Sequence, residues 1–199
     1  ASGSAILTPP LYNNQVIYVQ ATLGDCNSFR VPYTVAVIPQ IVGTFFKFDV
    51  RGCAGNRNGM ILMAGSGGSG QLQYSIDGGQ TWQNQSNFFN LAAGNYTLRI
   101  RDVLYPMCTQ TISTSVVITE PAPLNAQVVV IPSNTCTSNG NGAITVRNQT
   151  GGSGSYQYSI NNGLTWQTSA IFVNLHPGVY IVRMRDSQYP NCTHFIQTI

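Results

Sequence analysis

Five cysteines carry the clearest chemistry in this 199-residue chain. Four of them fall at matched places in a duplicated sequence, with Cys53 and Cys136 separated by 136 − 53 = 83 positions and Cys108 and Cys192 by 192 − 108 = 84. A matched pair in each copy of a small β domain predicts internal disulfides, so we expect Cys53 to join Cys108 and Cys136 to join Cys192. Each bond would stabilise its domain by about 4 kcal/mol in the chain-entropy model. Cys26 is left without a partner.

The other reactive side chains form no catalytic or metal-binding pattern. The six acids are scattered, and no two stand together as the acid and base of a glycosidase. Of the two histidines only His194 lies near a cysteine, which is too little for zinc. Asp102 and Asp186 each follow a predicted strand, where capping a turn is favoured over calcium binding because one carboxylate per copy is too few. We therefore expect no enzyme activity, no cofactor and no metal.

Two copies of one β-rich sequence must position these residues. "GGSGQLQYSIDGGQTWQ" at 67–83 returns as "GGSGSYQYSINNGLTWQ" at 151–167, and a period near 84 residues fits a small self-contained domain. Apolar and polar residues alternate in "GNYTLRIRD" and again in "GVYIVRMRD", as in strands with one buried face. About seven short strands per copy predict an all-β fold of tandem immunoglobulin-like β-sandwich domains in an end-to-end array.

Aromatic residues recur at matched places in both copies. Tyr96 and Tyr180 follow a turn and a glycine, as in the tyrosine corner of Greek-key sandwiches, so we expect their hydroxyls to bond backbone. Trp82 and Trp166 lie in the glycine-rich hairpins, where an exposed indole could stack on a sugar. A single Trp at the same place in each copy is instead expected to fill the core.

The composition excludes several classes of protein. Charged residues make up 8% of the chain and hydrophobic residues 43%, which favours packed cores over disorder. The net charge is +3 but the basic residues are scattered, so we expect no nucleic-acid partner, and no run is long enough for a membrane span.

The candidate ligand contacts are on strand faces and end loops. The arginines could meet an anionic polysaccharide, although a solvated strand face that blocks sheet association is favoured. The tyrosines precede a Pro and a Cys in loops, where ligand contact and packing over a disulfide are both open. These candidates are Arg99, Arg101, Arg183, Arg185, Tyr105 and Tyr189.

Longer stretches resemble known families. "GGSGSYQYSINNGLTWQ", "NLHPGVYIVRMRDSQYPNC" and "VVITEPAPL" resemble the SprB repeat of large surface adhesins in gliding bacteria with type IX secretion, over residues 41–199. "LTPPLYNNQVIYVQATLGDCNSFRVPYTVAVIP" is similar to the C-terminal half of a bacterial Ig-like domain. The resemblance implies an extracellular, cell-surface location and, as partners, neighbouring repeats of a longer chain and the secretion and gliding machinery.

These observations predict three domains and a non-catalytic role. Residues 1–39 are expected to be the half Ig-like domain, 40–123 the first repeat, and 124–199 a second repeat whose last strand is truncated. The linker "ITEPAPLNAQVVV" has two prolines and no Gly or Ser, which predicts a stiff junction and a rod. We expect a stalk in an adhesin or filament; the alternative is a carbohydrate-binding accessory array of a secreted enzyme.

Overall fold

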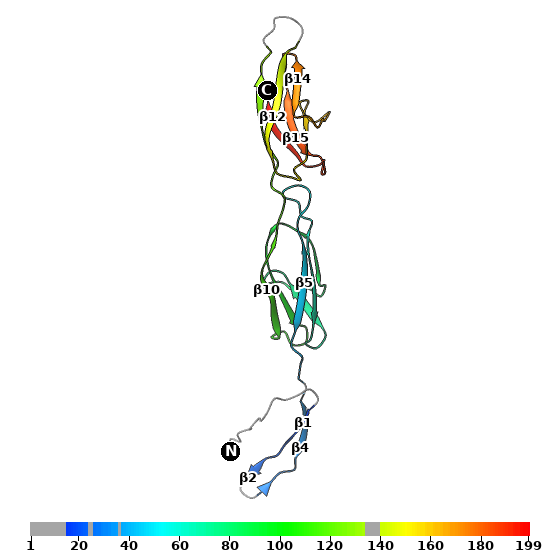
Figure 1. The fold of residues 1–199 in the computed structure, drawn as a ribbon. Coiled ribbons are helices and arrows are strands. Elements are labelled where there is room, and N and C mark those ends of the chain that lie inside the picture. The colour runs from blue at the N-terminus through cyan, green and yellow to red at the C-terminus, as the bar shows by residue number, and fades with distance from the viewer. Residues whose placement is uncertain (1–14, 24–25, 36, 134–139) are drawn as a thin grey trace.

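The structure is a computed structural model that describes residues 15–23, 26–35, 37–133 and 140–199. Its regular elements are all β-strands, and they form three bodies that follow one another end to end (Figure 1). The predicted all-β fold of tandem sandwiches is confirmed. A search of the described residues finds no helix long and apolar enough to cross a membrane.

The N-terminal body is a long antiparallel hairpin. Strand β1 (Gln15–Val19) pairs with β4 (Val31–Val35), and β2 (Thr22–Leu23) pairs with β3 (Cys26–Asn27). The β2 end of the hairpin points away from the rest of the molecule (Figure 1). Residues 1–14 of the predicted half domain lie outside the described residues.

The first sandwich consists of two three-stranded antiparallel sheets with strand orders β5-β6-β8 and β10-β9-β7. About seven strands were predicted, but the segment that returns from the Trp82 hairpin forms no regular strand and contributes only an isolated bridge between Tyr74 and Gln83. The strands are β5 (Val42–Phe48), β6 (Gly59–Ser66), β7 (Leu72–Ser75), β8 (Asn87–Leu91), β9 (Gly94–Asp102) and β10 (Thr109–Ile118).

The second sandwich repeats this topology with sheets ordered β11-β12-β14 and β13-β15-β16. The correspondence of the sheets follows the duplication in the sequence, since each strand takes the place of its copy. The strands are β11 (Asn125–Ile131), β12 (Gly142–Thr150), β13 (Tyr156–Ser159), β14 (Ile171–Leu175), β15 (Ile181–Asp186) and β16 (Thr193–Thr198).

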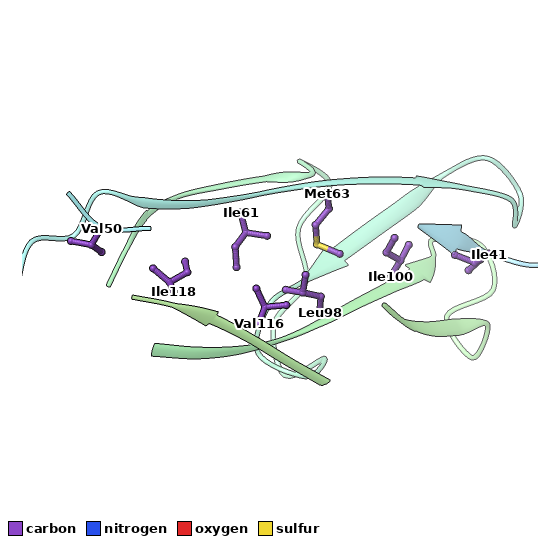
Figure 2. Packing of buried hydrophobic residues seen from close by; sticks show 8 residues of the cluster. All are labelled: Ile41, Val50, Ile61, Met63, Leu98, Ile100, Val116 and Ile118. Atoms are coloured by element: carbon purple, nitrogen blue, oxygen red, sulfur yellow. The ribbon is translucent and has the colours of Figure 1, made fainter. Parts of the chain in front are cut away.

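Each core lies between the two sheets and follows the predicted alternation. In β9, Leu98 and Ile100 are fully buried while Arg99 and Arg101 face outward, and β15 repeats this pattern. Figure 2 shows the aliphatic side chains of the first sandwich meeting between the strands. Burial of each such side chain stabilises the fold by roughly 1.5–3 kcal/mol. The cluster comprises Ile41, Val50, Ile61, Met63, Leu98, Ile100, Val116 and Ile118.

Both predicted tyrosine corners are present. The Tyr96 hydroxyl donates a hydrogen bond to the Ala92 carbonyl (2.9 Å), and the Tyr180 hydroxyl donates to the His176 carbonyl (2.8 Å). Each tyrosine ring packs half-buried against its own core, so the corner fixes the entry to β9 and to the segment leading into β15.

Candidate functional site

A disulfide joins the two sandwiches and closes neither of them. Cys53, in the loop after β5, is bonded to Cys192, in the loop after β15, across a sequence separation of 139 residues. Cys108 is free and exposed. The predicted pairs Cys53–Cys108 and Cys136–Cys192 are therefore wrong, because one cysteine of each pair, Cys53 and Cys192, is bonded to the other. Cys136 itself lies outside the described residues, and Cys26 is free and exposed.

Strand direction explains why the expected pairing fails. Strands β5 and β9 run in opposite directions along the first sandwich, so the loops that follow them lie at opposite ends. The loop after β5 begins beside the end of β10, where the Val50 amide donates to the Thr119 carbonyl (2.9 Å). The loop after β9 lies beside the linker residues 38–41 at the other end. Cys53 therefore faces the second sandwich, and Cys108 faces away from it.

The disulfide lies in a close junction between the sandwiches. Gly52 and Cys53 from the first sandwich line a groove together with Tyr189 and Pro190 from the second. A Cβ at Gly52 would lie 3.6 Å from the Tyr189 ring, so this tyrosine packs beside the disulfide. Of the two interpretations of Tyr189, the geometry agrees with packing. Tyr105, its counterpart in the first sandwich, is 48% exposed.

A buried aspartate anchors the glycine-rich loop of the first sandwich. Asp102 is 0% exposed, and its carboxylate accepts hydrogen bonds from the Ser69 backbone amide and from the Ser69 hydroxyl (2.9 Å). It also accepts the backbone amides of Leu104 (2.8 Å) and Tyr105 (2.9 Å), which confirms its turn-capping role. At Gly68, where φ is 62°, any side chain would collide with this carboxylate, so the loop requires glycine.

Asp186 makes the same contacts in the second sandwich. It is 0% exposed and accepts the Ser153 backbone amide (2.5 Å) and hydroxyl (2.8 Å). The amides of Gln188 (2.8 Å) and Tyr189 (3.0 Å) complete the set. The cap on the following turn was predicted, whereas the bond to a loop 33 residues earlier was not.

Hydrogen bonding decides the charge of these two carboxyls. Burial alone would raise the pKa of Asp102 and Asp186 above the ordinary value of 3.8, but the bonds from the serines and the turn amides outweigh burial and lower both pKa values. Both groups are therefore carboxylates at neutral pH. No group of three or more His, Cys, Asp or Glu comes together in the part of the chain that the structure describes. The arrangement acts as a hydrogen-bonded anchor.

Each anchored loop in turn binds the linker that enters its own sandwich. The Gly68 amide donates to the Pro39 carbonyl (2.8 Å), and the Gly152 amide donates to the Ala122 carbonyl (2.9 Å). Gly151, with φ at 85°, lies so close to the Pro123 carbonyl that a Cβ would clash with it. The linker is therefore fixed to the second sandwich before the first strand of that sandwich begins.

Trp82 and Trp166 lie outside the two hydrophobic cores, so their predicted core role is wrong. Each indole is half-buried, and the guanidinium of Arg101 or Arg185 lies 4.5 Å from the centre of its ring. The Trp82 indole N–H donates to the Gly79 carbonyl (2.9 Å). The outward positions of β9 and β15 carry arginines. In each sandwich the indole of the glycine-rich hairpin packs against one of these arginines, in a cation–π contact. Aliphatic side chains fill the core instead.

The four candidate arginines come together in pairs, one pair on each sandwich. They are half-buried and hydrogen-bonded, which differs from the freely solvated face that was favoured. None of them forms an ion pair with another described residue, so their positive charges are not neutralised within this part of the chain. Their bonds join Arg101 to Gln73 (2.9 Å), Arg185 to Gln157 (2.8 Å), Arg99 to Gly78 (3.2 Å) and Thr109 (3.0 Å), and Arg183 to Asn162 (2.7 Å).

A segment of the second sandwich matches a known family. A SprB repeat is found at residues 128–165. The match runs from β11 through β12, the anchored glycine-rich loop and β13 into the hairpin, and it ends just before Trp166. No curated protein and no solved structure matches the chain. The SprB repeat belongs to cell-surface proteins, and together with the all-β fold it points to a structural, adhesin-like region.

Proposed function

We propose that this chain is a non-catalytic stalk segment of a secreted cell-surface adhesin or filament, and that it transmits tension along its length. The observation that carries this proposal is the Cys53–Cys192 disulfide. Strand β5 runs the length of the first sandwich, the disulfide crosses the junction, and β16 runs along the second sandwich. A short covalent route therefore spans both sandwiches. This route bypasses the residues that lie between Cys53 and Cys192 in the sequence.

This route decides which parts of the fold tension can reach. When the two ends are pulled, residues between Cys53 and Cys192 stay slack as long as the disulfide is intact. Tension acts on β5 and β16, and β5 is held by continuous antiparallel pairing to β6 from Val42 to Phe48. Because both ends of β5 lie on the covalent route and the strand is already extended, pulling the ends apart adds little to its length. Such an arrangement suits a spacer that resists stretching.

The same proposal covers the domain boundaries and the partners. We assign residues 124–199 to the SprB repeat whose segment 128–165 matches the family. We assign residues 40–123 to a further SprB-type repeat that precedes it, since the two sandwiches have the same sheet order. Residues 1–39 are assigned to the C-terminal half of an Ig-like domain. We place the chain outside the cell, with neighbouring repeats and the type IX secretion and gliding machinery as partners, and a disulfide is in keeping with that location.

Small-angle X-ray scattering on the oxidised chain tests the stalk. The distance distribution should be that of an elongated particle, with the sandwiches in line as in Figure 1. A Cys53→Ser variant should broaden the distribution because the junction loses its covalent bond, while the Cys108→Ser control should leave it unchanged. A compact distribution from sandwiches folded back on each other would overturn the proposal.

A second candidate is polysaccharide binding, as in a carbohydrate-binding array of a secreted enzyme. It is supported by the half-buried indoles outside the cores and by the unneutralised arginines beside them. Glycan-array binding with a Trp82→Ala, Trp166→Ala double variant tests it. Loss of binding by the double variant at a temperature where both sandwiches are still folded would support it, and no binding by the parent chain to neutral or anionic glycans would reject it.

A further inference from the structure

We propose that Cys108 is the attachment point for a second inter-sandwich disulfide. Its partner would be a cysteine on the end loop of a β-sandwich repeat that packs against the N-terminal end of the first sandwich. The choice of partner rests on the proposed stalk function. The site itself rests on a comparison between the surroundings of Cys108 and Cys192.

The two cysteines lie in equivalent clefts. Around Cys192 the cleft is lined by linker residues 122–124, by residues 192–194 and by the Cys53 loop of the preceding sandwich. Around Cys108 it is lined by linker residues 38–41 and by residues 108–110. The loops correspond at a shift of 192 − 108 = 84 and the linkers at 122 − 39 = 83, as in the duplicated sequence. The Cys108 cleft is thus lined by the same two segments as the Cys192 cleft. Among the described residues, no loop of a neighbouring sandwich takes the place that the Cys53 loop has beside Cys192.

The loop that carries Cys108 already has the conformation of the bonded one. The Asp102 amide donates to the Cys108 carbonyl (3.0 Å), and the Cys108 amide donates to the Tyr105 carbonyl (2.8 Å). In the second sandwich the Asp186 amide donates to Cys192 (3.0 Å), and Cys192 donates to Tyr189 (2.8 Å). A disulfide at Cys108 would therefore need no rearrangement of this loop.

Exposed apolar side chains precede the free thiol in the same loop and give independent support for a partner. The first sandwich has "VLYPMC" where the second has "SQYPNC", so three polar positions of the bonded loop are apolar in the free one. Exposed apolar groups gathered at one end of a domain indicate a contact surface. Their exposed fractions are 36% for Val103, 60% for Leu104, 48% for Tyr105 and 94% for Met107.

The other free cysteine of the described residues does not fit as the partner. Cys26 lies on β3, which pairs with β2 at the end of the hairpin remote from the first sandwich (Figure 1). The bond we propose joins two thiols with release of two protons and two electrons. The electrons reduce the disulfide of an extracytoplasmic thiol–disulfide oxidoreductase to two thiols, so the reaction is balanced.

The decisive experiment is a non-reducing peptide map of the full-length protein from the cell surface, with free thiols alkylated during isolation. We expect the Cys108 peptide to be linked to a cysteine peptide from a neighbouring sandwich. An alkylated Cys108, a small-thiol adduct or a bond to Cys26 would each overturn the proposal. The stalk is tested separately, because scattering from the 199-residue chain depends on Cys53 and Cys192 and not on Cys108.

A second measurement uses the 199-residue chain itself. A peptide with the sequence of residues 49–59 around Cys53, activated as a thionitrobenzoate mixed disulfide, should react several-fold faster with Cys108 than a scrambled peptide does. Cys26, assayed in a Cys108→Ser variant, should not distinguish the two peptides. Met107→Asn should slow the reaction of Cys108 with the loop peptide but not with a small reagent. Equal rates for both peptides at Cys108 would contradict the proposed docking.

Discussion

The two sandwiches share their internal contacts and differ where they meet other parts of the chain. Both hold a glycine-rich loop with a buried aspartate, close a tyrosine corner and stack an arginine on an indole. Cys192 is covered by the preceding sandwich, whereas Cys108 is exposed. The hairpin turn carries Asp77 in the first sandwich and Asn161 in the second. Interactions within a sandwich are therefore repeated, while those between bodies depend on the neighbour.

The largest expected effect comes from removing a buried aspartate. Asp102→Ala leaves the amides of Ser69, Leu104 and Tyr105 without their acceptor, and each hydrogen bond to a charged group contributes about 1.5–3 kcal/mol. We expect the first sandwich to lose about 3 kcal/mol or more of unfolding free energy. Urea unfolding followed by domain-specific hydrogen exchange measures this loss.

Asp186→Ala is the matched variant in the second sandwich. If the internal contacts are independent, each variant should lower the stability of its own sandwich and leave the other within about 0.5 kcal/mol. If either variant lowered the unfolding free energy of both sandwiches equally, the two sandwiches would unfold as one unit. Their internal contacts would then not be independent.

The next prediction compares the stability lost on removing an indole with the stability lost on removing a core side chain. Trp82→Ala removes a partly exposed cation–π contact and one hydrogen bond, for which we expect a loss of about 1–2 kcal/mol. Leu98→Ala in the same sandwich should cost about 2–5 kcal/mol because Leu98 is fully buried. Chemical denaturation of both variants gives the two numbers. A tryptophan loss equal to or greater than the leucine loss would place the indole in the core.

The smallest effect is a difference in acid stability between the sandwiches. Burial opposes ionisation of Asp77, but hydrogen bonds led by that from Thr81 outweigh it and lower its pKa to about 2. Because the unfolded pKa is about 3.9, ionised Asp77 stabilises the first sandwich above about pH 4, and this contribution is lost as the pH falls towards 2. Asn161 in the second sandwich does not titrate.

Melting temperatures measured between pH 4 and pH 2 test this difference. The first sandwich should lose more stability than the second over this range. Asp77→Asn should narrow the gap without closing it, because the pKa of Asp49, which pairs with Lys47, is also lowered and Asp49 has no counterpart in the second sandwich. A gap unchanged by Asp77→Asn would show that Asp77 does not contribute.

Local patterns predicted the strands and the contacts close in sequence. The alternation in "GNYTLRIRD" identified Leu98 and Ile100 as core residues, and a glycine before Tyr96 identified the corner. The turn cap by Asp102 followed from its place after a strand. Its bond to Ser69 joins two loops 33 residues apart, and no local pattern encodes such a pair.

The errors came from deciding which end and which face a residue occupies. The sequence did contain a signal against the Cys53–Cys108 pair, because the predicted strand before Cys108 runs opposite to the one before Cys53. Counting strand directions would have placed these cysteines at opposite ends. Trp82 was wrongly predicted to lie in the core because its partner, Arg101, is on a strand distant in sequence. A Trp beside glycines has the same local sequence pattern whether the hairpin packs into the core or onto the outer face of a sheet.

Single-molecule force spectroscopy on the chain tethered at its two ends tests the central claim most directly. With the Cys53–Cys192 bond intact, the residues between the two cysteines should stay hidden from extension. Reduction, or Cys53→Ser, should add up to about 500 Å of contour length, at about 3.6 Å for each step of the 139-residue separation, and Cys108→Ser should add none. The same extension with and without reductant would contradict a covalent route through the junction.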